Sequence, residues 1–108
     1  DVGILRVYQT EQGLLVAALA PGGAAEKAGI RGPQIIRQRR RQGPLVYEYT
    51  TIDRSAADLI VGVDGQKIKN ADDFLSLIES KHPGETVTLN ILRQNRLIDV
   101  PVRLEAGE

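Results

Sequence analysis

The organisation of this chain of 108 residues depends on positions 20–30, which read Ala-Pro-Gly-Gly-Ala-Ala-Glu-Lys-Ala-Gly-Ile. The Pro-Gly-Gly triplet interrupts regular structure, and the alanine-rich residues after it favour a helix of little more than one turn. Gly29 supplies the left-handed conformation that ends such a helix. Because an isolated helix of this length is unstable in water, we expect it to be held by packing against the rest of the chain.

Two β-compatible runs precede this stretch, at residues 4–8 and 14–18. The five residues between them are polar and end in Gly13, a composition typical of a hairpin connection. The N-terminal part of the chain is therefore expected to form an antiparallel strand pair that leads into the short helix.

Four further strands are indicated in the second half of the chain. Residues 59–63 run into Asp-Gly, a strong turn signal, after which the sheet resumes at 66–68. Apolar and polar residues alternate over 86–91 and 98–104, as in half-buried strands, and Gln94-Asn95 forms a tight turn between the two. Pro101 faces outward and lacks an N–H, which indicates an edge strand or a bulge.

One amphipathic helix is predicted over about 71–80. Asn70 is its N-cap, and Asp72 and Asp73 lie in the first turn, where the helix dipole favours negative charge. His-Pro-Gly at 82–84 ends it.

The apolar positions of this helix cover an arc of roughly 160°, wider than the stripe of about 100° that a single core contact requires. Phe74 and Ile78 lie at the centre of the arc and are expected in the core. Leu77 lies on one margin, and Ala71 and Leu75 lie on the other. One margin is therefore available to line a groove.

Residues 33–56 differ from the rest of the chain and look inserted. They contain an arginine run, then Gly-Pro, then a β-like segment at 45–50. The arginines are Arg37, Arg39, Arg40 and Arg41. Either Ile35-Ile36 pairs with 45–50 as a hairpin with the arginines at its tip, or the whole is a mobile excursion; connections of this length are usually functional or disordered.

Charge and composition exclude several classes of function. The 14 basic and 14 acidic residues balance, so no overall field attracts nucleic acid or a membrane surface. No apolar run approaches the about 20 residues of a membrane span, and the N-terminus lacks the layout of a signal peptide. The absence of cysteine excludes disulfides, thiolate zinc sites, iron–sulfur clusters and cysteine nucleophiles.

Catalysis and metal binding find little support in the sequence. His82 is the only histidine, and it precedes Pro-Gly in a turn, where a solvated role is expected. A catalytic triad would require Ser55, Ser76 or Ser80 beside it, and no Gly-x-Ser-x-Gly motif is present. One histidine with scattered carboxylates has no metal-ligand spacing. We therefore expect no catalytic residue, no cofactor and no metal.

The order of these elements resembles the bacterial-type PDZ domain, in particular that of HtrA/Deg-type trypsin-like serine proteases. The resemblance is carried by residues 13–16, 20–30, 57–68 and 82–87. It implies an α/β, mostly β fold: a partly open β-sandwich with one main helix and one short helix. Residues 1–108 would be a single PDZ domain, in which 33–56 interrupts a link that usually has two or three residues.

The resemblance also implies a binding site for C-terminal or extended apolar peptides, formed by β-strand addition. The apolar-Gly-apolar loop would bind a terminal carboxylate, the strand after it would pair with the peptide, and the main helix would form a wall. These residues are Val2, Gly3, Ile4, Leu5, Arg6, Ala71, Leu75 and Ile78. From periodicity alone, 2–6 is more simply an ordinary edge strand and Leu75 a core residue.

Partners implied by the resemblance are the C-termini or extended segments of unfolded proteins and a protease domain of the same chain. The resemblance further implies an extracytoplasmic compartment such as the periplasm, and this fragment is expected to be inactive alone. Neither nucleic acid nor membrane contact is expected. One alternative is the PDZ module of another protease or of a scaffold protein.

A second alternative is a docking or polyanion-binding module that acts through Arg37, Arg39, Arg40 and Arg41. Four arginines within five positions can neutralise phosphates. Grooves that bind single-stranded nucleic acid have aromatic residues among the basic ones. That pattern is missing here, although Tyr47 and Tyr49 lie nearby. A solvated loop tip, or a contact with an acidic patch on a neighbouring domain, is the simpler expectation.

Overall fold

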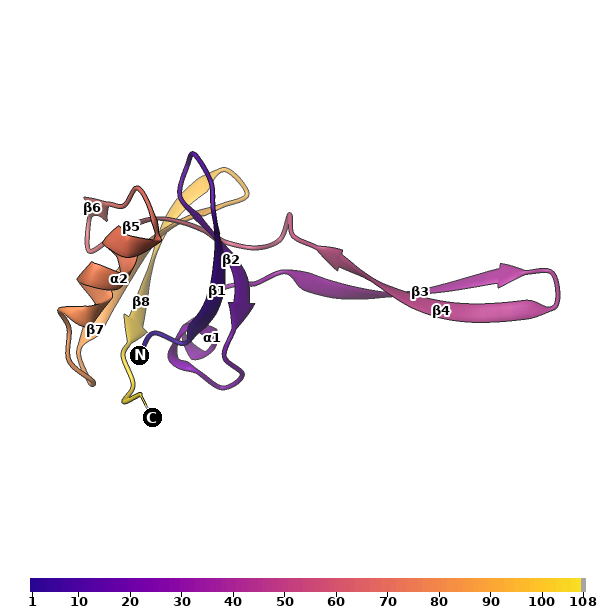
Figure 1. Cartoon of the computed structure of the whole chain (residues 1–108), viewed down its shortest axis with the longest axis horizontal. Helices are drawn as coiled ribbons and strands as arrows, with labels where there is room; N and C mark the ends of the chain where they lie inside the picture. Colours follow the sequence, from indigo (N-terminus) through magenta and orange to yellow (C-terminus); the bar gives the residue numbers. More distant parts are fainter. Residues whose placement is uncertain (108) are drawn as a thin grey trace.

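The computed structural model describes residues 1–107. A curved antiparallel sheet and two helices form the body, and a long two-stranded arm projects from it (Figure 1). The elements are β1 (Ile4–Gln9), β2 (Leu14–Leu19), α1 (Ala24–Ala28), β3 (Gln34–Gln42), β4 (Leu45–Asp53), β5 (Leu59–Val63), β6 (Gln66–Lys67), α2 (Ala71–Glu79), β7 (Thr86–Arg93) and β8 (Arg96–Arg103).

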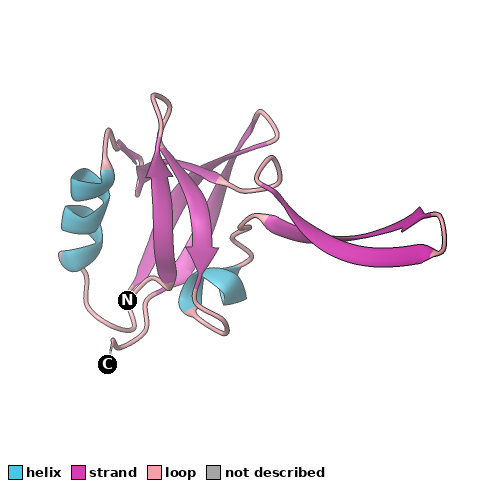
Figure 2. Ribbon diagram, turned by 45° about the vertical axis from the view of Figure 1, so that its right-hand side comes forward, coloured by secondary structure: helices cyan, strands magenta, loops and turns pink. Residues whose placement is uncertain are grey.

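The strands of the body follow the order β1-β2-β5-β7-β8, with the short β6 paired to β5, and β3 and β4 form a separate sheet. The body sheet is curved, so that β1 and β2 pass across β7 and β8, while α2 lies along one side and α1 at one end (Figure 2). The expected architecture is confirmed: a mostly β, partly open sandwich with one main and one short helix.

The core lies inside this curved sheet. Its fully buried members come from strands of both halves of the chain: Leu14, Val16, Ile60, Val87, Leu89, Ile91 and Val102. Helix α1 adds the buried Ala24 and Ala25, and Gly29 ends it in the left-handed conformation at φ 93°. Phe74 and Ile78 of α2 are buried as predicted.

The tight turns of the body also agree with the sequence. Asp64-Gly65 and Gln94-Asn95 all have positive φ angles, as two-residue hairpin turns require when they match the strand twist. Pro101 lies in β8, opposite Thr88 of β7. Because β8 is an edge strand, no further strand needs a hydrogen bond from the N–H that Pro101 lacks.

Helix α2 begins where its capping residues place it. The Asn70 side chain accepts a hydrogen bond of 2.8 Å from the Asp73 N–H, and the Asp73 carboxylate accepts one of 2.9 Å from the Lys69 N–H. The Ala71 N–H donates to the Gln9 side-chain oxygen at 3.3 Å. This contact joins the start of α2 to the end of β1.

The segment 33–56 is a hairpin arm, but the arginines are not at its tip. Pairing runs without interruption from Gln34 opposite Asp53 to Gln42 opposite Leu45. The turn consists of Gly43-Pro44, the only strong turn-forming pair in the segment, so the arginine run becomes part of β3. The expectation of an arginine-rich tip was therefore wrong. The segment is a hairpin, which was one of the two alternatives, but Ile35 and Ile36 pair with Ile52 and Thr51 and not with 45–50 as predicted.

The two ends of the arm are joined at its base by Asp58, the buried charged residue of the described chain. The Asp58 N–H donates to the Arg31 carbonyl at 2.9 Å, and its carboxylate accepts the Arg31 N–H at 2.8 Å. Because residues 31 and 58 bond directly to each other, the body is continuous across the base of the arm.

Arg93 of β7 neutralises this carboxylate. Its Nε and Nη2 atoms each donate to an Asp58 oxygen at 2.8 Å, and Nη2 also donates to the Gly29 carbonyl at 2.9 Å. Hydrogen bonding to Asp58 raises the pKa of Arg93 above its ordinary value, against the desolvation that lowers it. The pair therefore links the end of α1, the base of the arm and the end of β7.

Removing Arg93 should destabilise the body. Arg93→Ala leaves the buried Asp58 carboxylate without its counter-charge, and we expect a loss of about 3 kcal/mol in the free energy of unfolding, measured by urea denaturation at pH 7. Because the folded-state pKa of Arg93 is raised, this stabilisation is fully present at neutral pH and is lost only as pH rises through that value. Lys27→Ala, which removes the exposed ion pair with Glu105, should cost less than about 1 kcal/mol. Equal losses in the two variants would contradict this account.

Deleting the arm should leave the body folded. Replacement of residues 33–56 by two glycines keeps the bonds between Arg31 and Asp58 and shortens the loop that they close. We expect the free energy of unfolding to be unchanged or higher by up to about 1.5 kcal/mol, because closing a shorter loop costs less entropy. Thermal denaturation followed by circular dichroism measures this, and an unfolded product would show that the arm is part of the folding unit.

Candidate functional site

Strand β1 is one of the two edges of the body sheet, and β8 is the other. Strand β1 pairs only with β2, so one row of its N–H and C=O groups has no strand beside it. Its register with β2 shifts on both sides of Arg6, which bends the strand at that point. An unpaired edge of this kind can accept an extended peptide as an additional strand.

The loop before β1 is held by the stretch at 20–30 that includes α1. The Val2 carbonyl accepts the Ala25 N–H and the Gly3 carbonyl accepts the Ala20 N–H, both at 2.9 Å. Gly3 has φ 81°, and a Cβ atom there would lie 2.9 Å from the Ala24 nitrogen. Only glycine fits, because both the backbone angle and the space exclude a side chain.

A carboxylate already occupies this loop. Asp1 Oδ1 accepts a hydrogen bond of 2.9 Å from the Gly3 N–H, which is one of the donors that the resemblance assigns to a ligand. The main chain of Asp1 is itself held by Glu105, through contacts of 2.7 and 3.1 Å. This role of Asp1 was not predicted, although an aspartate two residues before a glycine N–H is a known turn-forming arrangement that could have indicated it.

The residues expected around the peptide differ in how far they are exposed. Ile4 and Ala71 are half-buried and pack against the core, whereas Ile78 belongs to the core itself at 8% exposure. Leu5 and Leu75 are 67% and 50% exposed. The simpler interpretation of Leu75 as a core residue is therefore wrong. Val2 and Gly3 are buried in the loop, and Arg6 is exposed on β1.

No catalytic arrangement forms around His82. This residue is exposed, and its main-chain N–H donates to the Glu85 carboxylate at 2.9 Å. The Ser80 hydroxyl donates to the Leu77 carbonyl and the Ser55 hydroxyl to Asp53, so both are used locally. These Ser55 hydrogen bonds lower the pKa of Asp53.

Neither a metal-binding cluster nor a membrane-spanning helix is present among residues 1–107. Within this range no group of three or more histidine or carboxylate side chains is arranged to hold a metal ion. Neither helix of the same residues has the length and apolar character needed to cross a bilayer.

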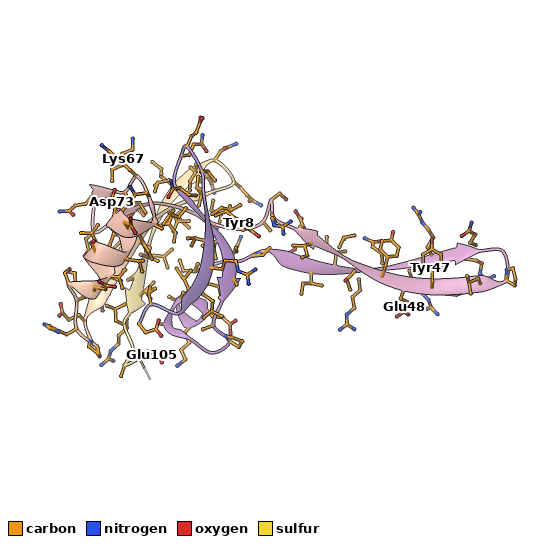
Figure 3. The ribbon with its side chains drawn as sticks, in the orientation of Figure 1. Tyr8, Tyr47, Glu48, Lys67, Asp73 and Glu105 are labelled. Carbon is orange, nitrogen blue, oxygen red and sulfur yellow. The ribbon has the colours of Figure 1, made fainter. Side chains whose placement is uncertain are left out.

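The arm carries the remaining candidate residues away from the body (Figure 3). Direct cross-strand partners share a face of the ribbon, so Arg37, Arg39 and Arg41 lie on one face and Arg40 lies on the other, beside Tyr47. Every residue from 34 to 52 is exposed.

Comparison with known proteins agrees with this geometry. A family model described as PDZ domain matches residues 2–104. A probable periplasmic serine protease do/HhoA-like of Haemophilus influenzae is 26% identical over 91% of this chain, which covers 16% of that protein. Protease Do-like 1, chloroplastic, of Arabidopsis thaliana is 30% identical over 86% of this chain and 18% of its own length.

A third relative, a probable periplasmic serine endoprotease DegP-like of Bartonella henselae, is 35% identical over 47% of this chain and 10% of that protein. The chain thus spans less than a fifth of the length of each of these relatives. The family match, in contrast, extends through the Gly3 loop, the curved sheet and both helices. The chain therefore belongs to the PDZ domain family.

Proposed function

We propose that this chain is the peptide-binding regulatory domain of an HtrA-like serine protease and that it binds C-terminal or extended apolar peptides as a strand added to β1. The observation that carries the proposal is the free edge of β1, which follows directly on the backbone loop at Gly3. Main-chain hydrogen bonds to this edge would supply affinity, and pockets for alternate side chains would supply specificity.

The amides of Val2, Gly3 and Ile4 would bind the terminal carboxylate of the peptide. The carboxylate of Asp1 at 2.9 Å from the Gly3 nitrogen supports an anion site at this place. It also makes binding competitive, since an incoming carboxylate has to displace the Asp1 side chain from the same N–H.

Helix α2 would provide the wall that faces the last apolar side chain of the peptide. Leu75 is the apolar side chain of α2 that remains half exposed. On the same helix, Ala71 packs against the core and Ile78 belongs to it. On β1, residues 4–6 would pair with the peptide backbone. The hydrogen bond from the Ala71 N–H to Gln9 supports a stable spacing between the helix and this strand.

The partners follow from the names of the relatives. Two of these relatives are described as periplasmic serine proteases and one as a chloroplastic protease. We therefore place this domain in an extracytoplasmic compartment, beside a protease domain of its own chain that receives the unfolded proteins captured at β1. A PDZ module of another protease or of a scaffold protein is the alternative, and it predicts the same groove.

Binding should depend on a free C-terminus. In an amide chemical-shift titration, apolar-ended peptides with free carboxylates should shift the resonances of 2–6 and Leu75, and the same peptides with amidated ends should bind at least about tenfold more weakly. Equal binding of both pools would indicate strand addition without carboxylate capture. Absence of shifts with either pool would contradict the proposal.

Removing the competing carboxylate should strengthen binding. Asp1→Ala frees the Gly3 N–H and removes a negative charge from the site, so affinity for free-carboxylate peptides should rise about fivefold, equivalent to about 1 kcal/mol of like-charge repulsion. Glu11→Ala removes the same charge from the distant β1–β2 turn and serves as the control. A fall in affinity with Asp1→Ala would instead assign Asp1 the role of holding the loop in its binding conformation.

A further inference from the structure

The arm has no role in the proposed groove, yet it is regular and long. Its two strands have nine residues each, and the structure reaches 58 Å in its longest dimension. An isolated two-stranded hairpin is marginally stable in water because it buries little apolar surface. Both edges and both faces of this ribbon are exposed, so they are open to a partner.

One face of the arm carries a row of positive charge. Arg37, Arg39 and Arg41 lie opposite Thr50, Glu48 and Val46 on this face. Alternate residues of a strand are about 7 Å apart, so the guanidinium groups repeat at the spacing of alternate side chains in a neighbouring strand. We call these three residues the arginine row.

The arginine row is almost unneutralised. Arg39 lies 3.9 Å from Glu48, with both side chains about three-quarters exposed, and this is the only ion pair of the arm in the part of the chain that the structure describes. Arg37 and Arg41 have no acidic group within 4 Å among residues 1–107. Guanidinium groups that have no acidic neighbour are suited to paired hydrogen bonds with the carboxylates of a ligand.

The same face becomes apolar where the arm meets the body. Ile35 and Ile52 are direct cross-strand partners there and are 72% and 55% exposed. They border a hollow of about 510 Å³ whose body side includes Leu19 and Ile30, with Glu26 as the one charged residue of its lining. A ligand that follows the arginine row toward the body therefore meets a site for a bulky apolar side chain.

This composition favours a protein as the partner over a nucleic acid. Residues 34–53 contain four arginines, two tyrosines and no lysine, as in protein interfaces, where arginine and aromatic residues are enriched and lysine is depleted. The exposed isoleucines at the base have no use in phosphate binding. Pairing of two β3 edges from two copies of the chain is disfavoured, because it would place arginine rows side by side.

We propose that the β3 edge of the arm binds an extended acidic segment of a partner protein. Carboxylates at alternate positions of this segment lie beside the arginine row, and a bulky apolar residue at its body-proximal end enters the hollow at Ile35 and Ile52. The arm is thus a second peptide-binding edge, selective for acidic segments, and it is independent of the groove at β1.

The test uses the full chain and a fluorescent peptide of five alternating Glu-Thr repeats with a leucine at one end. The two versions are (Glu-Thr)5-Leu and Leu-(Thr-Glu)5, so that the leucine shares a face with the glutamates at either end, and both ends are blocked so that the Gly3 loop is not engaged. Fluorescence anisotropy should show that one version binds. Replacing every Glu of that version by Gln should weaken its binding at least tenfold. A peptide with the same composition but its glutamates in one block should also bind at least fivefold more weakly, because half of its carboxylates face away from the row.

Matched variants locate the site. One triple variant combines Arg37→Gln, Arg39→Gln and Arg41→Gln, and it should lower the affinity for the peptide at least tenfold. The control combines Lys67→Gln, Arg96→Gln and Arg103→Gln, which removes the same charge from the body, and it should change the affinity less than twofold. Replacement of 33–56 by two glycines should abolish binding while peptides with free apolar ends still bind the groove. Equal effects of the two triple variants, or tighter binding of an oligo-dT strand than of the peptide, would overturn the proposal.

Discussion

The buried ion pair between Asp58 and Arg93 is the constraint on which the rest of the structure depends. Asp58 is completely excluded from solvent, and its two oxygens accept bonds from the Arg93 guanidinium and the Arg31 N–H. A buried carboxylate without such partners would be very costly. The hydrogen bonds that Asp58 requires therefore hold the end of α1, the start of β5 and the end of β7 in one arrangement.

This closure lets one chain present two different edges. In the body, β1 is an edge beside a loop of backbone amides, which suits a free carboxylate at the end of an apolar peptide. In the arm, β3 is an edge with side-chain charges, which suits carboxylates along a segment. Because Arg31 and Asp58 bond to each other at the base, the arm takes no part in the packing of the core.

Much of this could be predicted from local sequence. The Asp64-Gly65 and Gln94-Asn95 turns, the Asn70 cap and the alternation along β7 and β8 each depend on residues that are close in the chain, so they were predicted correctly. The short helix and the apolar-Gly-apolar loop were recognisable for the same reason. The existence of the hairpin was only one of two alternatives, because strand pairing depends on the turn that closes it.

Outside residues 33–56, the sequence by itself determined which segments are strands, helices and turns, and it indicated the family to which they belong, because those features arise from neighbouring residues. Only the tertiary structure decided that the arginines line one face of β3, that Asp1 occupies the Gly3 N–H, and that Asp58 meets Arg93, which is 35 residues away. These contacts are set by register and by packing between distant segments. The free energy of the whole folded chain decides which of the possible pairings forms. Burial of a charge or closure of a loop is favourable in only one arrangement of that chain.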